Sequence, residues 1–95
     1  MPKLNDKDLL VALADLPDWK SDGSAISRVF TCPTFPDAIT FATRVAFDAE
    51  AADHHPDLLI SYRKVTVTWS THSEGGVTRK DIAAAKATEA AFHHK

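Results

Sequence analysis

Three histidines of this 95-residue chain could form one site for proton transfer: His54, His55 and His72. An imidazole titrates near neutral pH, so it can accept a proton from one atom and donate a proton to another. Two carboxylates, Glu50 and Asp53, lie within about one helical turn of His54 and could hold an imidazole in one tautomer. The pattern therefore predicts acid–base chemistry in a pocket lined by histidines.

Asp81 has two interpretations. It follows Thr78 by three residues, which is the spacing of a capping signature at the start of a helix. Its carboxylate could therefore serve only to cap that helix and to compensate the helix dipole. It could instead support the histidine site. Capping statistics favour the first interpretation and leave the second open.

A metal site is the main alternative explanation for three histidines, because imidazoles are common zinc ligands. The only cysteine, Cys32, is far away in the sequence, and no two histidines show the i, i+4 spacing of a helical zinc motif. We therefore expect no metal. The other two histidines, in the segment 93–95, are predicted to form a solvated tail.

Three predicted helices would position these residues. The first is capped by Asn5 and stops before Pro17, the second runs from Thr34 to about Asp53, and the third starts at Thr78. The residues expected to be buried are Leu9, Val11, Leu13 and Leu16 in the first helix, Ala38, Phe41, Ala42, Val45, Ala49 and Ala52 in the second, and Ile82, Ala85 and Phe92 in the third.

Four predicted strands form two hairpins, at residues 19–20 with 25–31 and at residues 58–62 with 65–70. The element order is therefore helix, strand, strand, helix, strand, strand, helix. Hairpins pair their strands antiparallel, and helices with one apolar stripe cover one face of a sheet. The sequence thus predicts an α+β fold: a two-layer sandwich with a four-stranded antiparallel sheet, helices on one face, and the other face open.

The register of the second hairpin follows from its turn. If Arg63 and Lys64 form a two-residue turn, Tyr62 pairs with Val65, and the extended ladder sets His55 opposite His72. The three histidines would then converge at one end of the sheet. A slip of one or two residues would keep this clustering but change the pairs.

Composition excludes several other classes of protein. Residues 1–95 are long enough for a single domain, and the small core of such a domain favours a homo-oligomer. The net charge of −2 without a basic cluster predicts no direct nucleic-acid binding. The longest stretch without Asp, Glu, Lys or Arg, nine residues from Val65 to Ser73, is too short to cross a membrane. A lone cysteine cannot form an internal disulfide, so we expect a cytoplasmic protein.

The spacing of the site residues resembles the signature of the pterin-4a-carbinolamine dehydratases, also known as dimerisation cofactors of a homeodomain transcription factor. The matching pattern is Glu50, three residues, His54-His55-Pro56, five residues, Tyr62, nine residues, His72, eight residues and Asp81. The resemblance extends over about Trp19 to Asp81. It implies the α+β fold described above and a dehydratase that converts a 4a-hydroxytetrahydropterin to quinonoid dihydropterin, in the recycling of tetrahydrobiopterin.

The resemblance also implies roles for individual residues. His54 and His72 would transfer protons, His55 would bind and orient the pterin, and no metal or redox cofactor would be needed. The residues implied to contact the substrate are Asp53, Pro56, Thr71, Ser73 and Glu74, and those implied to support the site are Glu50, Asp81 and Trp19. Two positions depart from the family pattern: Leu58 replaces an aromatic residue of some members, and Arg63 replaces a common asparagine in the turn.

Two other functions fit the same resemblance. The chain could be a non-catalytic oligomerisation module that binds an effector helix, as a transcription cofactor does. It could also act on a related pterin in molybdenum cofactor metabolism. The resemblance further implies a homodimer or homotetramer, assembled through helix faces and sheet edges.

Overall fold

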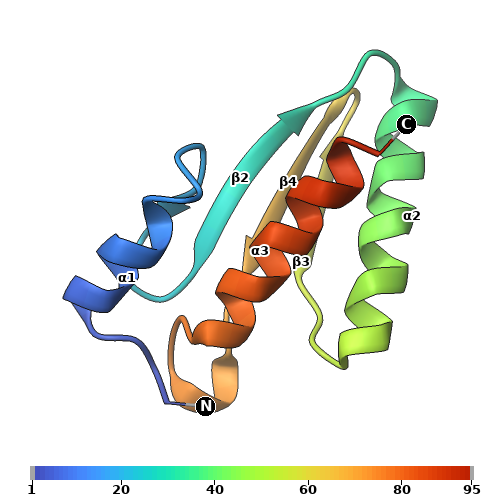
Figure 1. Ribbon diagram of the computed structural model, residues 1–95. Helices are drawn as coiled ribbons and strands as arrows, with labels where there is room; N and C mark the ends of the chain where they lie inside the picture. Colours follow the sequence, from blue (N-terminus) through green and yellow to red (C-terminus); the bar gives the residue numbers. More distant parts are fainter. Residues whose placement is uncertain (1, 95) are drawn as a thin grey trace.

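The fold consists of a small sheet and three α-helices, and the computed structural model describes residues 2–94 (Figure 1). In chain order the elements are α1 (Asp6–Leu13), β1 (Lys20–Ser21), β2 (Ile26–Thr31), α2 (Phe35–Ala52), β3 (Asp57–Ser61), β4 (Lys64–Trp69), the 3-10 helix η1 (His72–Glu74) and α3 (Arg79–Phe92). The predicted order of helices and strands is confirmed. The structure adds η1, a short turn that the periodicity did not indicate.

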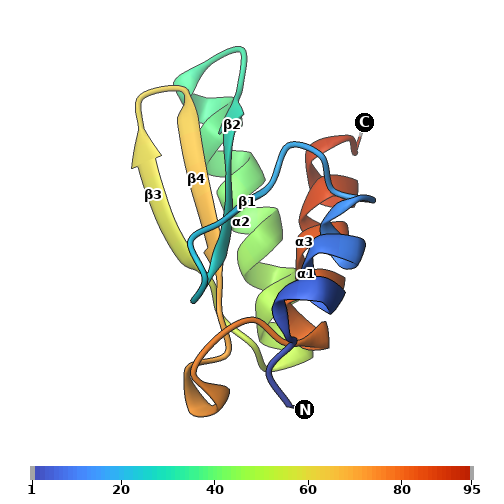
Figure 2. The ribbon, with the colours of Figure 1, turned by 90° about the vertical axis from the view of Figure 1, so that its left-hand side faces the viewer.

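The four strands form one antiparallel sheet in the order β1-β2-β4-β3. Figure 2 shows the helices on one side of this sheet. The strand residues that face the helices are buried, and they include Ile26, Phe30, Val65, Val67 and Trp69. On the other face, Val29 and Leu59 are exposed. The predicted two-layer α+β sandwich with one open sheet face is therefore confirmed.

Each helix begins at a residue whose side chain caps it. The Asn5 side chain accepts a hydrogen bond from the backbone N–H of Asp8 at 2.8 Å, and the Thr34 hydroxyl accepts one from the N–H of Asp37 at 3.2 Å. Thr78 and Asp81 form a reciprocal capping box at the start of α3. All three predicted caps are confirmed.

The end of α2 determines where His54 lies. Asp53 adopts a left-handed conformation, with φ 51° and ψ 43°, and the backbone N–H of His54 still bonds to the carbonyl of Ala49 at 3.1 Å. Pro56 disfavours helical angles at the preceding residue, so the chain cannot continue the helix. The predicted end near Asp53 is confirmed, and it puts His54 at the start of the connection to β3.

The register predicted for the second hairpin is wrong by two residues. The turn is formed by Tyr62 and Arg63, with Tyr62 at φ 53°, so that Ser61 pairs with Lys64 and Ile60 with Val65. A shift of two residues keeps every side chain on the same face of the sheet, and the hydrophobic pattern therefore does not distinguish the two registers. His55 and His72 are not opposite each other in the ladder, and η1 brings His72 to the same end of the sheet instead.

The first helix buries less than predicted. Leu9 and Leu13 are partly buried against the core and Leu16 is buried, but Val11 is 66% exposed. α1 has only eight residues and contacts the domain along one narrow stripe, and Val11 lies about 200° around the helix from Leu9 and from Leu13. Ala52, expected in the stripe of α2, is also exposed.

Aromatic residues form the centre of the core. The ring centroid of Phe30 lies 4.8 Å from that of Phe41, 4.8 Å from that of Phe92 and 6.0 Å from that of Trp19. These contacts join β2 to α2, to α3 and to the segment before β1. No helix within residues 2–94 is long and apolar enough to cross a membrane.

We expect Phe30→Ala to lower the free energy of unfolding by about 3–5 kcal/mol, because it removes a buried ring and leaves a cavity. The adjacent Val29→Ala on the open face should cost no more than about 0.5 kcal/mol. Urea unfolding followed by far-UV circular dichroism measures both values. Equal losses for the two variants would contradict this description of the core.

Candidate functional site

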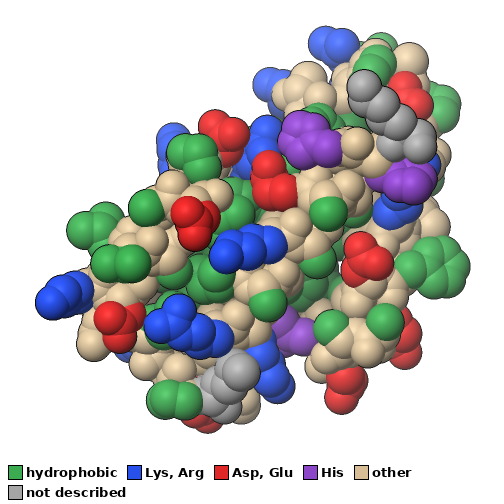
Figure 3. All heavy atoms as spheres, in the orientation of Figure 1, with side chains coloured by type: hydrophobic (Ala, Val, Ile, Leu, Met, Phe, Trp, Pro, Cys, Tyr) green, Lys and Arg blue, Asp and Glu red, His purple; other side chains and the backbone are tan. Residues whose placement is uncertain are grey.

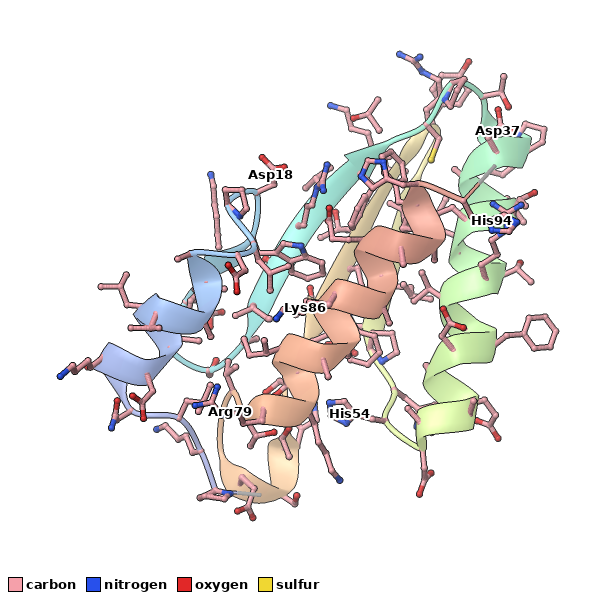
Figure 4. All side chains as sticks on the ribbon, viewed as in Figure 1. Asp18, Asp37, His54, Arg79, Lys86 and His94 are labelled. Carbon is pink, nitrogen blue, oxygen red and sulfur yellow. The ribbon has the colours of Figure 1, made fainter. Side chains whose placement is uncertain are left out.

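The three histidines singled out from the sequence border one shallow pocket. It has a volume of about 320 Å³ and lies at the end of the sheet near the start of α3. Figure 4 shows His54 between the start of α3 and the end of α2, and Figure 3 shows a histidine side chain recessed between these helices. The residues that line the pocket are Asp53, His54, His55, Ser70, Thr71, His72, Ser73 and Lys80.

His54 is the most firmly held of the three histidines. Its Nε2 lies 2.6 Å from Oδ1 of Asp81, and its ring stacks on the Trp69 indole at a centroid distance of 5.3 Å and an interplanar angle of 25°. Only 13% of its side chain is exposed. A ring held on one face and at one nitrogen keeps a single orientation, which a proton-transfer group needs.

Asp81 both caps α3 and contacts His54, so its contacts fit both interpretations that the sequence left open. Its Oδ2 accepts the backbone N–H of Thr78 at 2.9 Å, which completes the capping box, while its Oδ1 contacts His54. The same Oδ2 accepts a hydrogen bond from the hydroxyl of Thr71 at 2.8 Å. The Asp81 side chain is 0% exposed, so its charge is stabilised by these partners rather than by water.

His55 points to the other side of the chain, as expected for neighbouring residues of an extended segment. Its Nε2 lies 2.8 Å from Oε1 of Glu50, and both side chains are largely exposed. An exposed pair of this kind contributes little to stability. It leaves His55 at the mouth of the pocket, where it can turn toward a ligand.

His72 enters the pocket from η1, and it is exposed there together with Ser73. The left-handed Gly75, with φ 74°, ends η1. The backbone N–H of Thr71 bonds to the carbonyl of Gly76 at 2.9 Å, so the segment closes into a loop. This loop carries His72 back toward His54.

Five of the predicted site residues do not line the pocket. Glu50 and Asp81 contact its histidines, and the other three are Pro56, Glu74 and Trp19. Pro56 and Glu74 lie next to residues that line it, but Trp19 is elsewhere. The Trp19 indole is buried in the core against Phe30, and its N–H donates to Oε2 of Glu89 at 3.1 Å. Glu89 is eight residues beyond Asp81 on α3, about 12 Å along the helix. The contacts of Trp19 therefore belong to the core.

Sequence reasoning missed two features of the site. Lys80 lines the pocket from the first turn of α3, and its position next to Asp81 was the available signal. The second is Trp69, a buried strand residue that also supports the His54 ring.

A second hollow adjoins His54. It lies between α2 and α3, has a volume of about 200 Å³ and is mainly apolar, with Val45, Ala49 and Ala84 among its lining residues. His54 and Lys80 border both this hollow and the histidine pocket.

The geometry supports metal ligation and thiol chemistry less well than it supports proton transfer. Within residues 2–94, no three side chains of His, Cys, Asp or Glu lie close enough together to hold a metal ion. Cys32 is buried outside the pocket; burial, and to a smaller extent the Asp37 carboxylate, raises the pKa of its thiol. A thiol of raised pKa is a poor nucleophile. The arrangement of histidines instead suits proton transfer to and from a bound molecule.

Comparisons with known proteins point to one family. Residues 2–91 match the model of a family described as pterin 4 alpha carbinolamine dehydratase. A protein of Chloroflexus aurantiacus is 46% identical over 94% of this chain and 96% of its own length, and one of Nocardia farcinica is 52% identical over 83% of each chain. Both carry the name "Putative pterin-4-alpha-carbinolamine dehydratase". A crystal structure from Brucella melitensis, titled as a transcriptional coactivator/pterin dehydratase, has a TM-score of 0.89 and 37% identity and covers 95% of this chain and 98% of its own.

The buried and the exposed carboxylate of the site should differ in their effect on stability. Asp81→Asn should lower the free energy of unfolding by about 2–3 kcal/mol, because hydrogen bonds to a charged group contribute about 1.5–3 kcal/mol when the group is buried. Glu50→Gln makes the same chemical change at the surface and should cost less than about 1 kcal/mol. Urea titration of both variants measures the difference, and similar losses would contradict the burial assigned to Asp81.

Proposed function

This chain belongs to the pterin 4 alpha carbinolamine dehydratase family, a family of hydro-lyases, and we propose that it removes water from a 4a-hydroxytetrahydropterin to give quinonoid dihydropterin. This reaction would recycle tetrahydrobiopterin for an aromatic amino acid hydroxylase. The observation that carries the proposal is the convergence of His54, His55 and His72 on one pocket, with His54 held by a buried carboxylate.

The dehydration needs two proton transfers and no change of oxidation state. The bond between C4a and the hydroxyl oxygen breaks as that oxygen receives a proton and leaves as water. The adjacent ring nitrogen loses its proton as the new carbon–nitrogen double bond forms. One proton is delivered and one is removed, so histidines can serve both steps without a metal or redox cofactor.

The three histidines divide these tasks in the proposal. His54 and His72 approach the pocket from different segments, the end of α2 and η1, so they can act at different atoms of one substrate. His55, with its exposed ring at the mouth, would bind and orient the pterin. A shallow pocket suits a flat bicyclic molecule, and Asp53 and Ser73 line it where polar edges of the pterin could bind.

We expect His54→Ala, His55→Ala and His72→Ala each to slow dehydration of chemically generated 4a-hydroxytetrahydropterin. The losses for His54 and His72 should be about 10²- to 10⁴-fold, which is the usual contribution of a positioned acid or base. His93→Ala is the matched control, because His93 is exposed at the end of α3 and should keep the full rate.

Unchanged rates in all three variants would refute the site. A wild-type chain with no turnover would refute the enzymatic function, and binding of an effector helix that depends on α3 but not on His55 would then favour the non-catalytic module.

We also propose that the chain forms a homo-oligomer in the cytoplasm, through the outer face of α2 and α3. Phe47 is 74% exposed beside a hollow lined by Ala51, Ala87 and Ala90, and Arg44 and Asp48 add charges of both signs. A large apolar side chain next to a hollow lined by alanines is self-complementary, so two copies related by a two-fold axis could each bury the other's Phe47.

Light scattering at micromolar concentration should therefore give a mass of at least twice the 10.4 kDa of one chain. Phe47→Asp should reduce that mass, because it would place a charge in the interface. Leu10→Asp is the matched control, since Leu10 on α1 is also 74% exposed but lies outside the hollow. A wild-type mass of one chain, or equal effects of the two variants, would contradict the proposal.

A further inference from the structure

Two buried threonines, Thr71 and Thr78, form a row of hydrogen bonds that ends at the Asp81 carboxylate. Their hydroxyl oxygens are 2.9 Å apart, and Thr71 is also 2.8 Å from Oδ2 of Asp81. The hydroxyl of Thr78 accepts the backbone N–H of Lys80 at 3.2 Å. Thr71 comes from the segment after β4 and Thr78 from the cap of α3, so the contact joins two parts of the chain.

The direction of each hydrogen bond follows from the number of hydrogens available. A carboxylate has none to give, so the hydroxyl of Thr71 donates to Asp81. The Thr71 oxygen is then free to accept, and the hydroxyl of Thr78 donates to it. The Thr78 oxygen in turn accepts from the N–H of Lys80. Each hydroxyl therefore donates once and accepts once, and every donor in the row points toward Asp81.

This row of donors determines how Asp81 meets His54. Oδ2 of Asp81 already accepts from Thr71 and from the N–H of Thr78. Oδ1 is left for Nε2 of His54, which must carry a hydrogen in order to donate to it. Within residues 2–94 no protein group is hydrogen-bonded to Nδ1 of His54. Nδ1 is thus the ring nitrogen available to a bound molecule.

We propose that Thr71 and Thr78 are positioning residues for the dehydration: their hydroxyls orient the Asp81 carboxylate so that Nε2 of His54 keeps its hydrogen and Nδ1 exchanges protons with the substrate. A neutral His54 takes up at Nδ1 the proton that the pterin ring nitrogen loses, while His72 supplies the proton that leaves with the hydroxyl oxygen as water. Solvent then removes the proton of the His54 imidazolium from Nδ1 and restores that of His72. Asp81 stays a carboxylate throughout. The inference rests on the proposed function only in assigning these transfers to a pterin.

His55 provides an internal comparison. Its partner Glu50 is exposed, and Glu50 has no second protein hydrogen bond within residues 2–94 that would fix its carboxylate. Water can replace that pair, whereas Asp81 is closed off from water. The orienting row is thus specific to the histidine on the inner side of the chain.

The test replaces Thr71, because Thr78 also caps α3. Thr71→Val removes the hydroxyl and keeps the volume, and Thr71→Ser keeps the hydroxyl. Thr43→Val is the matched control, since the Thr43 hydroxyl donates only to the carbonyl of Ile39 within α2. Nitrogen-15 NMR of labelled histidines at about pH 8.5, where a free histidine is neutral, shows which ring nitrogen carries the hydrogen. Steady-state kinetics gives kcat and KM for the same proteins.

We expect His54 to carry its hydrogen on Nε2 in the wild type, in Thr71→Ser and in Thr43→Val. In Thr71→Val the other tautomer should become populated, and kcat should fall by about tenfold, the effect of one hydrogen bond to a charged group, with KM changed less than twofold. A hydrogen on Nδ1 in the wild type would overturn the proposal, even if Thr71→Val failed to fold. So would a folded Thr71→Val with the wild-type tautomer and kcat, or a Thr71→Ser as impaired as Thr71→Val.

The tautomer measurement needs no turnover. A wild type that shows the Nε2 hydrogen but no dehydration would refute the proposed function and leave the positioning role supported.

Discussion

A carboxylate without access to water must have its oxygens hydrogen-bonded by the protein, and Asp81 places this constraint on the whole site. Its three side-chain and backbone donors come from three separate segments: the connection after α2, the segment after β4 and the cap of α3. Because these donors share one acceptor, the segments cannot move independently. The start of a helix and the orientation of His54 are therefore determined by the same side chain.

His54 and His55 are adjacent in the chain, but the backbone places their side chains in different environments. The left-handed Asp53 ends α2, and the extended chain that follows sends His54 inward onto Trp69 and His55 outward to Glu50. One ring is held in a single orientation while the other can exchange partners with water. This division agrees with one histidine that transfers protons and one that recognises the ligand.

The sequence predicted most of the fold because caps, periodicity and breakers agree with one another. Asn5, Thr34 and Thr78 mark the helix starts through short-range contacts that are visible in the sequence. Long-range features were harder to predict. The width of the buried stripe on α1 depends on which parts of the domain α1 packs against. The separate locations of Trp19 and His54 depend on the three-dimensional path of β2 and α3. The role of Thr71 was also out of reach, since the sequence does not show where its hydroxyl points.

The predicted and observed registers of the β3–β4 hairpin differ by two residues. The core can accept either register, whereas the site requires the observed one. Either register keeps Leu58 and Ile60 on the helix-facing side, so packing alone accepts both. A slip of two residues, however, would carry the segment before β3 about 7 Å along β4, beyond hydrogen-bonding range of Asp81. The position of the two-residue turn, at Tyr62–Arg63 and not at Arg63–Lys64, is therefore a constraint from the site and not from the packing of the core. A homologue whose turn moved by one position along the chain would keep a packed core and lose the link between the imidazole and its carboxylate.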